Sequence, residues 1–318
     1  MDAVAPAPYL TEITGAGALQ WRNAVSRLLV DIEMSSVDAP AFEGHLRLRA
    51  VWGLRFADVT ASPSRSRSVR RAEIDRPAYI LCYQLTGTGT VSQDSRSAEL
   101  HPGELTLYAT DRHAELEFGP DFRALSLRVP VDLVDVPRSR IDPLLARVLP
   151  SDGLAPVMGG YLERAGALLD AGSPASRLQA ARTSVELFTT FVRSSLEDAG
   201  SDATGTLSAI RIVEYIDANL GDHELAPATI AAALHISVRQ LYKLFTADDT
   251  VATYIRRRRL AMCERDLADP ARAAEPIATI ARRWGFESAS HFGQLFREHS
   301  GFSPAAYRRD LFQVQRAA

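Results

Sequence analysis

A short motif occurs twice in the last third of this 318-residue chain, and the residues after it match both times. The segment ATIAAALHIS (228–237) is followed 50 residues later by ATIARRWGFE (278–287). The match continues downstream, where the apolar Leu241 corresponds to the apolar Phe292. A similarity that extends across a helix, a turn and the next helix indicates one structural unit used twice.

Each copy predicts two helices joined by a tight turn. A proline suits the first turn of the first helix, because its missing N–H costs nothing there. The turn often needs a positive φ, which Gly accepts freely and His accepts better than most residues. A serine before the second helix is a good N-cap. The paired residues are Pro227 and Pro276, Ala231 and Ala281 at the helix crossing, His235 and Gly285 in the turn, Ser237 and Ser288 at the caps, and Phe245 and Phe296 in the core.

The outer faces of the second helices carry side chains suited to DNA. Arg pairs with guanine, Gln with adenine and Ser with either, and such a helix enters the major groove by its N-terminal part. The alternative is two helical hairpins with a solvated polar face, which the repetition disfavours. The candidate DNA-binding residues are Ser237, Val238, Arg239, Gln240 and Lys243 in the first copy and Ser288, Ser290, His291, Gln294 and Arg297 in the second.

The segment YIRRRRLAMCERDL (254–267) lies between the copies and predicts a helix that fixes their spacing. Its arginines Arg256–Arg259 point all round such a helix at about 100° per residue, so they do not form one patch. We expect part of the run to be solvated, part to form intramolecular ion pairs, and one or two members to reach phosphate.

Residues 42–129 have the alternation and the Gly/Pro/Asp breaks of short strands, which favours an antiparallel barrel or sandwich. Aromatic residues at alternating positions line a ligand pocket or simply fill the core. The segment SPSRSRSVRR (62–71) is interpreted as a surface loop entering a strand, with Val69 its first buried position; the alternatives are a basic arm that touches nucleic acid, or an arginine that pairs with an anionic effector. The pocket candidates are Trp52, Tyr79, Tyr83, Phe118 and Phe122.

Residues 143–196 turn helical, and one apolar stripe runs along their second part. The stripe is equally compatible with packing on the strands and with a dimer interface, because an apolar stripe does not determine which surface covers it. The stripe consists of Leu178, Val185, Phe188, Val192 and Leu196.

Composition limits the remaining possibilities. The small polar run DAGSDATGT (198–206) predicts a linker between domains at 1–197 and 207–318. From residue 205 onward the net charge is +2, which permits DNA binding but does not demand it, and the rest of the chain carries −5. Two cysteines exclude a disulfide scaffold and a multi-cysteine zinc site. Without a long apolar run or a signal peptide, we expect a cytoplasmic protein that does not enter membranes.

The C-terminal region resembles the DNA-binding domain of AraC/XylS transcription regulators. The resemblance covers about 207–309 and rests on SVRQLYKLF (237–245), the 254–267 segment and IARRWGFESASHFGQLFREHSGFSPAAYRR (280–309). Two departures affect the first copy. Ala226 stands where a Ser or Thr cap is usual, and the loop TADDTVAT (246–253) is short and acidic.

The N-terminal half is similar, more weakly, to the cupin-like sensor domain of the same family. The matching segments are FEGHLRLRAVWGLRFADV (42–59), YILCYQLTGTGTVSQ (79–93) and the HPGEL turn (101–105). Together the resemblances imply an α+β two-domain protein with a cupin-like antiparallel β-barrel, then an all-α domain of seven helices. They imply a homodimeric, ligand-responsive activator of catabolic genes that binds asymmetric sites in double-stranded promoter DNA, contacts RNA polymerase and senses a small-molecule effector.

The alternative function is a barrel enzyme with an accessory helical tail that binds DNA or protein. A metal enzyme needs three or four converging ligands, and the candidates His45, His101, His113 and Glu104 lack a ligand-like spacing. The chain also lacks a nucleophile elbow, a phosphate loop and a dinucleotide fingerprint. We therefore expect no catalytic residues, no metal and no cofactor.

Overall fold

The computed structural model describes residues 9–37, 41–69, 76–198, 203–243, 245 and 250–309. The chain forms two compact units. The first comprises Met1–Val134 and Leu144–Asp198, and the second comprises Asp135–Pro143 and Ala199–Ala318. Among the described residues, no helix has the length and apolar character needed to cross a membrane.

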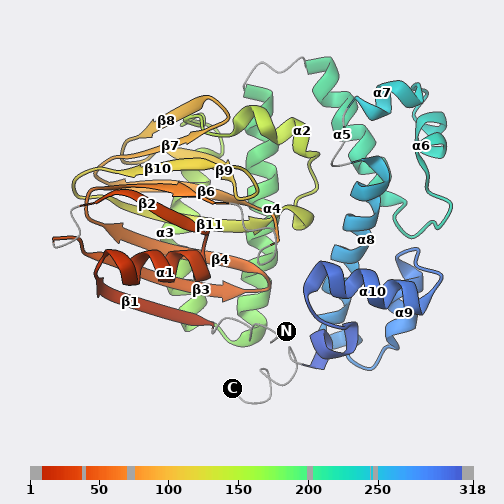
Figure 1. Ribbon diagram of the computed structural model, residues 1–318. Coiled ribbons are helices and arrows are strands. Elements are labelled where there is room, and N and C mark those ends of the chain that lie inside the picture. The colour runs from red at the N-terminus through yellow and green to blue at the C-terminus, as the bar shows by residue number, and fades with distance from the viewer. Residues whose placement is uncertain are drawn as a thin grey trace. The chain divides into compact units, whose positions relative to one another are not determined.

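The first unit is built on two antiparallel sheets (Figure 1). One has the order β1-β3-β4-β11-β6-β9 and the other the order β2-β5-β10-β7-β8. The strands are β1 (Leu10–Ala16), β2 (Ile32–Val37), β3 (Gly44–Val51), β4 (Leu54–Ala61), β5 (Ser64–Ser68), β6 (Ala78–Thr86), β7 (Gly89–Gln93), β8 (Arg96–Leu100), β9 (Leu105–Ala109), β10 (Ala114–Phe118) and β11 (Arg123–Pro130).

The strands predicted within 42–129 are present, but the loop predicted at 62–71 is wrong where the structure describes it. Residues 64–68 form β5, which pairs with both β2 and β10. Its serines are buried and its arginines are exposed, so the strand alternates with serine as the inward residue. Arg65 pairs with Glu117 and Arg67 with Glu33, so neither faces an effector inside the sheets. Val69 is half-buried, and residues 70 and 71 lie outside the described residues.

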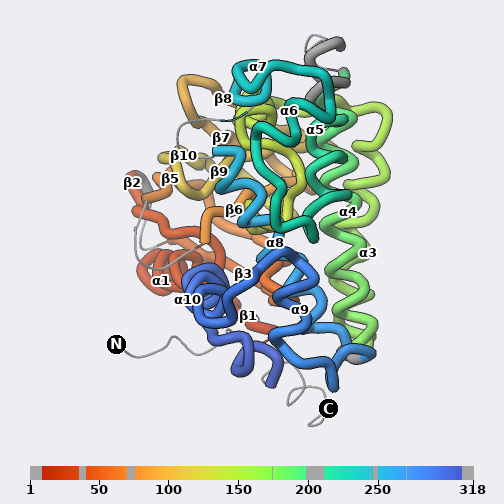
Figure 2. The backbone as a smooth tube through the Cα atoms, turned by 90° about the vertical axis from the view of Figure 1, so that its right-hand side faces the viewer, coloured from red at the N-terminus to blue at the C-terminus, as the bar shows by residue number. Residues whose placement is uncertain are grey.

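Helices complete the first unit. α1 (Ala18–Leu28) buries Trp21 among residues of both sheets, and the indole ring leaves no room for a Cβ at Gly44. α3 (Ala155–Ala171) and α4 (Pro174–Asp198) run side by side (Figure 2). Short helices η1 (Val131–Leu133), α2 (Arg138–Ile141) and η2 (Asp142–Leu144) follow β11, and α2 groups with the second unit.

The side chains of the predicted apolar stripe on α4 face the interior of the protein. Phe188, Val192 and Leu196 are buried, and Leu178 and Val185 are half-buried. α4 packs against α3 and β3. The stripe is therefore used for packing within the chain rather than left open as a dimer seam. α4 continues to Asp198 and α5 begins at Ala203, so both ends of the predicted linker are helical; residues 199–202 lie outside the described residues.

The second unit is helical. In its described residues there are seven α-helical segments after the linker, as the resemblance implied. One apolar cluster supports α6 and α7, and another supports α9 and α10. The segments are α5 (Ala203–Ala218), α6 (Pro227–Ala233), α7 (Val238–Tyr242), α8 (Val251–Leu267), α9 (Ile277–Arg283), α10 (Ala289–Ser300) and residues 304–309, with η3 (Pro270–Arg272) after α8.

Candidate nucleic-acid interface

The first repeat folds as a helix-turn-helix in which α6 and α7 meet through a tight turn. His235 has the positive φ predicted for it, 54°, and the N–H of Ile236 closes the turn on the carbonyl of Ala231. Ser237 caps α7 by accepting from the N–H of Gln240, at 3.2 Å. The side-chain carbonyl of Gln240 accepts from the Ser237 N–H in return, at 2.8 Å, which completes a capping box.

This capping box changes the roles of two candidate DNA contacts. Ser237 and Gln240 are exposed, but their side-chain oxygens are already engaged with each other and with the helix end. Arg239 and Lys243 are exposed and form no ion pair with the described residues. Among the candidates of this copy, these two are the cations on the exposed face, beside the exposed Val238.

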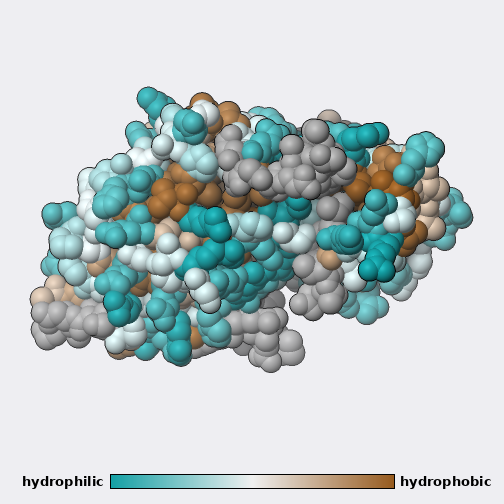
Figure 3. Space-filling model, turned by 90° about the horizontal axis from the view of Figure 1, so that it is seen from above, coloured by the Kyte–Doolittle hydropathy of each residue, from teal (hydrophilic) through white to brown (hydrophobic). Residues whose placement is uncertain are grey.

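Sequence reasoning missed one residue on this face. Tyr242 is 50% exposed and lies four residues after Val238, which is 38% exposed, so the two share a face of α7. At the right of Figure 3, where α6 and α7 lie in Figure 1, hydrophobic and hydrophilic side chains are exposed next to one another. The signal was available, because Tyr242 follows the buried Leu241 and so turns away from the core.

The second repeat folds in the same way with α9 and α10. Gly285 has φ of 76° in the turn, and Ser288 caps α10 by accepting from the His291 N–H at 3.3 Å. Phe292 and Phe296 are buried, and the five candidate contacts are exposed. Gln294 donates to Glu298 at 3.0 Å on the helix surface. Ser290, His291 and Arg297 have no such side-chain bond to described residues.

The arginine run on α8 divides as predicted. Arg256 is exposed, whereas Arg258 is buried and forms a bidentate pair with Asp217 of α5, both bonds at 2.9 Å. Arg259 donates to the carbonyls of Leu220 and Asp222, just after α5, and its guanidinium fills the space beside Gly285. Arg259 therefore connects the loop before the first repeat to the turn of the second.

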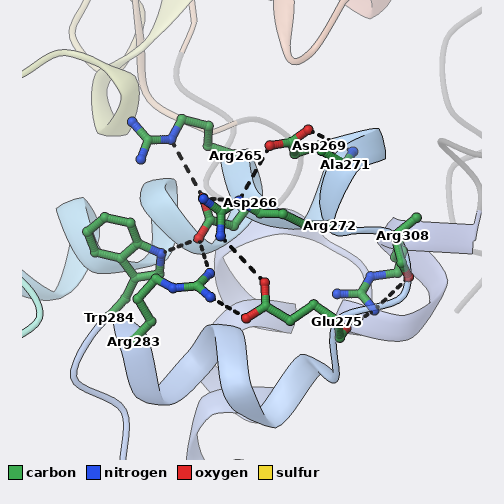
Figure 4. A network of polar contacts seen from close by, with 10 residues as sticks. Arg265, Asp266, Asp269, Ala271, Arg272, Glu275, Arg283, Trp284 and Arg308 are labelled. Atoms are coloured by element: carbon green, nitrogen blue, oxygen red, sulfur yellow. Dashed lines mark hydrogen bonds and ion pairs between the residues drawn. The ribbon is translucent and has the colours of Figure 1, made fainter.

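A buried carboxylate supports the second repeat (Figure 4). Asp266, at the end of α8, is 3% exposed and accepts from Arg283 at 2.8 Å and from the Trp284 indole at 2.9 Å. Arg283 also pairs with Glu275, and this hydrogen bond, with the one to Asp266, raises the pKa of the Arg283 guanidinium. Arg308 donates to the Glu275 carbonyl at 2.6 Å, which attaches the last described helix to the same network.

The first unit contains a cavity of about 50 Å³ between its two sheets and α1. Phe118 and Phe122 line it, stacked with ring centroids 4.0 Å apart. Cys82 also lines it, and burial raises the pKa of its thiol to about 11. The polar lining residues are Ser66, Cys82, Gln84, Thr90, Tyr108 and Ser126.

The other three pocket candidates lie outside this cavity. Tyr83 points to α3, where its hydroxyl donates to Glu163 at 3.1 Å, and Tyr79 shares that face of β6. Trp52 occupies the β3–β4 turn, and the guanidinium of Arg182 on α4 lies 6.0 Å from its ring centroid. The alternate residues of β6, Cys82 and Gln84, face inward instead.

The histidine and glutamate candidates for a metal site do not converge. His45 accepts from the Gly15 N–H, the His113 ring bonds the Ser68 carbonyl, and Glu104 accepts from the His101 N–H. Within the described part of the chain, these four residues form no group with metal-ligand spacing.

Two domain families match the chain. The AraC-binding-like domain matches residues 21–194, and a helix-turn-helix domain matches residues 230–310. The chain is 27% identical to "Transcriptional activator NphR" from Rhodococcus sp over 95% of its own length and 91% of that protein. It is 26% identical to the "XylDLEGF operon transcriptional activator" of Pseudomonas putida over 64% of its length and 66% of that protein.

A solved structure shares the fold. The crystal structure of the AraC-like transcriptional activator CuxR superimposes with a TM-score of 0.52 at 21% identity. The match covers 79% of this chain and 94% of the other.

Proposed function

The chain belongs to the AraC/XylS-type family of transcription regulators, and on that premise we propose that both of its helix-turn-helix units read one asymmetric promoter site. The protein is a DNA-binding regulator rather than an enzyme, which overturns the barrel-enzyme alternative. The DNA contacts, the effector, the polymerase contact and the dimer are our proposals.

One observation carries the proposal that both units bind DNA. In both repeats the central apolar residues of the second helix are buried, Leu241 in the first and Phe292 and Phe296 in the second. The opposite face of that helix remains exposed, with Arg239 and Lys243 in the first repeat and His291 and Arg297 in the second. Arginine bonds two guanine acceptors at once, and each such pair discriminates between bases by about 1–3 kcal/mol. Ser237 and Ser288 would orient these helices as caps rather than contact bases.

The test is a selection from random duplex DNA with the full chain at moderate salt. Two short sequence blocks about ten base pairs apart would support reading by both units. A single block would restrict base reading to one unit, and no enrichment would contradict the proposal. Arg239→Ala should relax base preference in one block, and Gln294→Ala or Arg297→Ala in the other.

We propose that the effector binds in the cavity between the two sheets and shifts the population of domain arrangements. An effector acts this way only if it binds one arrangement more tightly than the other. Relatives named as activators support activation, and hence a contact with RNA polymerase. Titrating a promoter-bound complex with candidate effectors and following transcription in vitro tests this step.

A homodimer would need a surface other than the α4 stripe. Val157 and Leu168 of α3 are 53% and 51% exposed and lie three turns apart on one face. We propose this face for dimerisation. Changing both residues to Glu should convert a dimer to a monomer in sedimentation velocity, and an unchanged dimer would exclude this face.

A further inference from the structure

Among the described residues, the lining of the cavity in the first unit contains no basic side chain and no carboxylate. Its lining consists of apolar side chains and the polar residues named above, none of which is Asp, Glu, Lys, Arg or His. An anion transferred into such a site loses its hydration and gains no counter-charge. This lining selects against carboxylates whatever their shape.

One polar atom of this lining has no partner among the described residues. Gln84 is fully buried, and its side-chain amide nitrogen donates to the Thr86 carbonyl at 2.7 Å. Its amide oxygen accepts nothing, and it lies beside Gly89 and Phe122, which both line the cavity. The bond to Thr86 fixes the orientation, because a flipped amide would bring two carbonyl oxygens together. A buried oxygen without a hydrogen bond is stabilised when a ligand donates one to it.

A second lining residue supplies an unmatched donor. Trp21 is 1% exposed, and its indole N–H has no acceptor among the described residues. A neutral ligand can offer a donor to the Gln84 oxygen and an acceptor to this N–H. A carboxylate offers acceptors only and leaves the Gln84 oxygen facing like charge.

We infer that the cavity takes an uncharged ligand with both a hydrogen-bond donor and an acceptor, of which a primary carboxamide is the simplest form. This inference rests on the proposed function of the cavity as the effector site. At about 50 Å³, the cavity has room for one or two water-sized groups, whereas a cavity that holds benzene has about 150 Å³. A ring-sized ligand therefore binds by moving lining side chains, while the neutral character of the lining stays the same.

The test compares shape-matched neutral and anionic molecules. We would titrate the full chain at neutral pH with benzamide and benzoate, and with isobutyramide and isobutyrate, by calorimetry. Each amide should bind at least about 100-fold more tightly than its carboxylate. Equal or tighter binding of the carboxylates would overturn the inference and leave an effector site of another kind in place.

A variant assigns the preference to Gln84. Gln84→Met should weaken amide binding about tenfold, whereas Ser92→Ala, which breaks a surface hydroxyl pair between Ser92 of β7 and Ser97 of β8, should leave it unchanged. Thermal unfolding of both variants verifies the fold. Binding of neither molecule at millimolar concentration, by a chain that still binds DNA, would overturn the inference alone. Amide binding by a chain that selects no DNA would instead contradict the proposed function.

Discussion

The two helix-turn-helix units share a sequence pattern but rest on different supports. The first rests on a mainly aliphatic cluster with α5 that also contains Tyr254, and its nearby buried charge is the Arg258–Asp217 pair. The second rests on an aromatic column in which Phe286, Phe292, Phe296 and Tyr307 contact in sequence, with centroids 5.1–5.4 Å apart. The repeated sequence pattern therefore determines the shape of each helix-turn-helix. Residues outside the repeat determine how it packs on the rest of the helical domain.

The largest effect should come from the aromatic column. Phe296→Ala removes a fully buried ring and should destabilise the second helix-turn-helix by about 3–5 kcal/mol, through lost burial and a cavity. The matched change in the first unit is Leu241→Ala, at about 2–5 kcal/mol. Hydrogen exchange should show Phe296→Ala opening α9 and α10 first, and Leu241→Ala opening α6 and α7. Equal opening of both units by either variant would make the domain one cooperative block.

The buried carboxylate should come next. Asp266→Ala leaves the Arg283 guanidinium and the Trp284 indole without their shared acceptor, and we expect a loss of about 3 kcal/mol. Asp266→Asn keeps one acceptor oxygen and should lose less. Chemical denaturation measures both, and a loss below about 1 kcal/mol for Asp266→Ala would show that Glu275 alone holds Arg283.

The sequence predicted the helices after the linker in more detail than the two sheets of the first unit. The caps Ser237 and Ser288 and the positive φ at His235 and Gly285 follow from local chemistry, which acts over a few residues. The strand at 64–68 was missed because alternating Ser and Arg looks like a polar loop. What makes it a strand is pairing with β2 and β10, distant in sequence.

The residues that line the cavity could not be predicted from the sequence for a different reason. Alternation along β6 separated Tyr79 and Tyr83 from Cys82 and Gln84, but a period of two does not tell which set faces inward. The size of Tyr79 and Tyr83 favours them as pocket lining, whereas α3 covers that face of β6 and Tyr83 packs against Gly159. The exposed faces of α7 and α10 follow from the repeat, and the exposed Tyr242 is an addition to the face predicted for α7.

A smaller effect separates the two turns. Gly285→Ala places a Cβ at positive φ and 2.7 Å from the Arg259 guanidinium carbon, so it should cost about 1–2 kcal/mol. His235→Gly relieves a similar backbone strain but adds freedom to the unfolded chain, so its net effect should be near zero. Thermal unfolding compares the two. A substantial loss for His235→Gly would mean that the imidazole makes a contact of its own.

The smallest expected effect is a gain in stability at the N-terminus of α6, in the first helix-turn-helix. Ala226 is the N-cap of α6, with the extended backbone that a capping serine adopts. The Thr229 hydroxyl already accepts from the Ala226 N–H at 2.9 Å, so half of a capping box exists. Ala226→Ser supplies the missing acceptor for the N–H groups of the first turn and should stabilise the unit by about 0.5–1 kcal/mol. Ala226→Val is the control, since it keeps an N-cap residue without a side-chain acceptor. If chemical denaturation finds the serine variant no more stable than the parent, the orphan N–H groups are already satisfied by water, and the two units do not differ at this end.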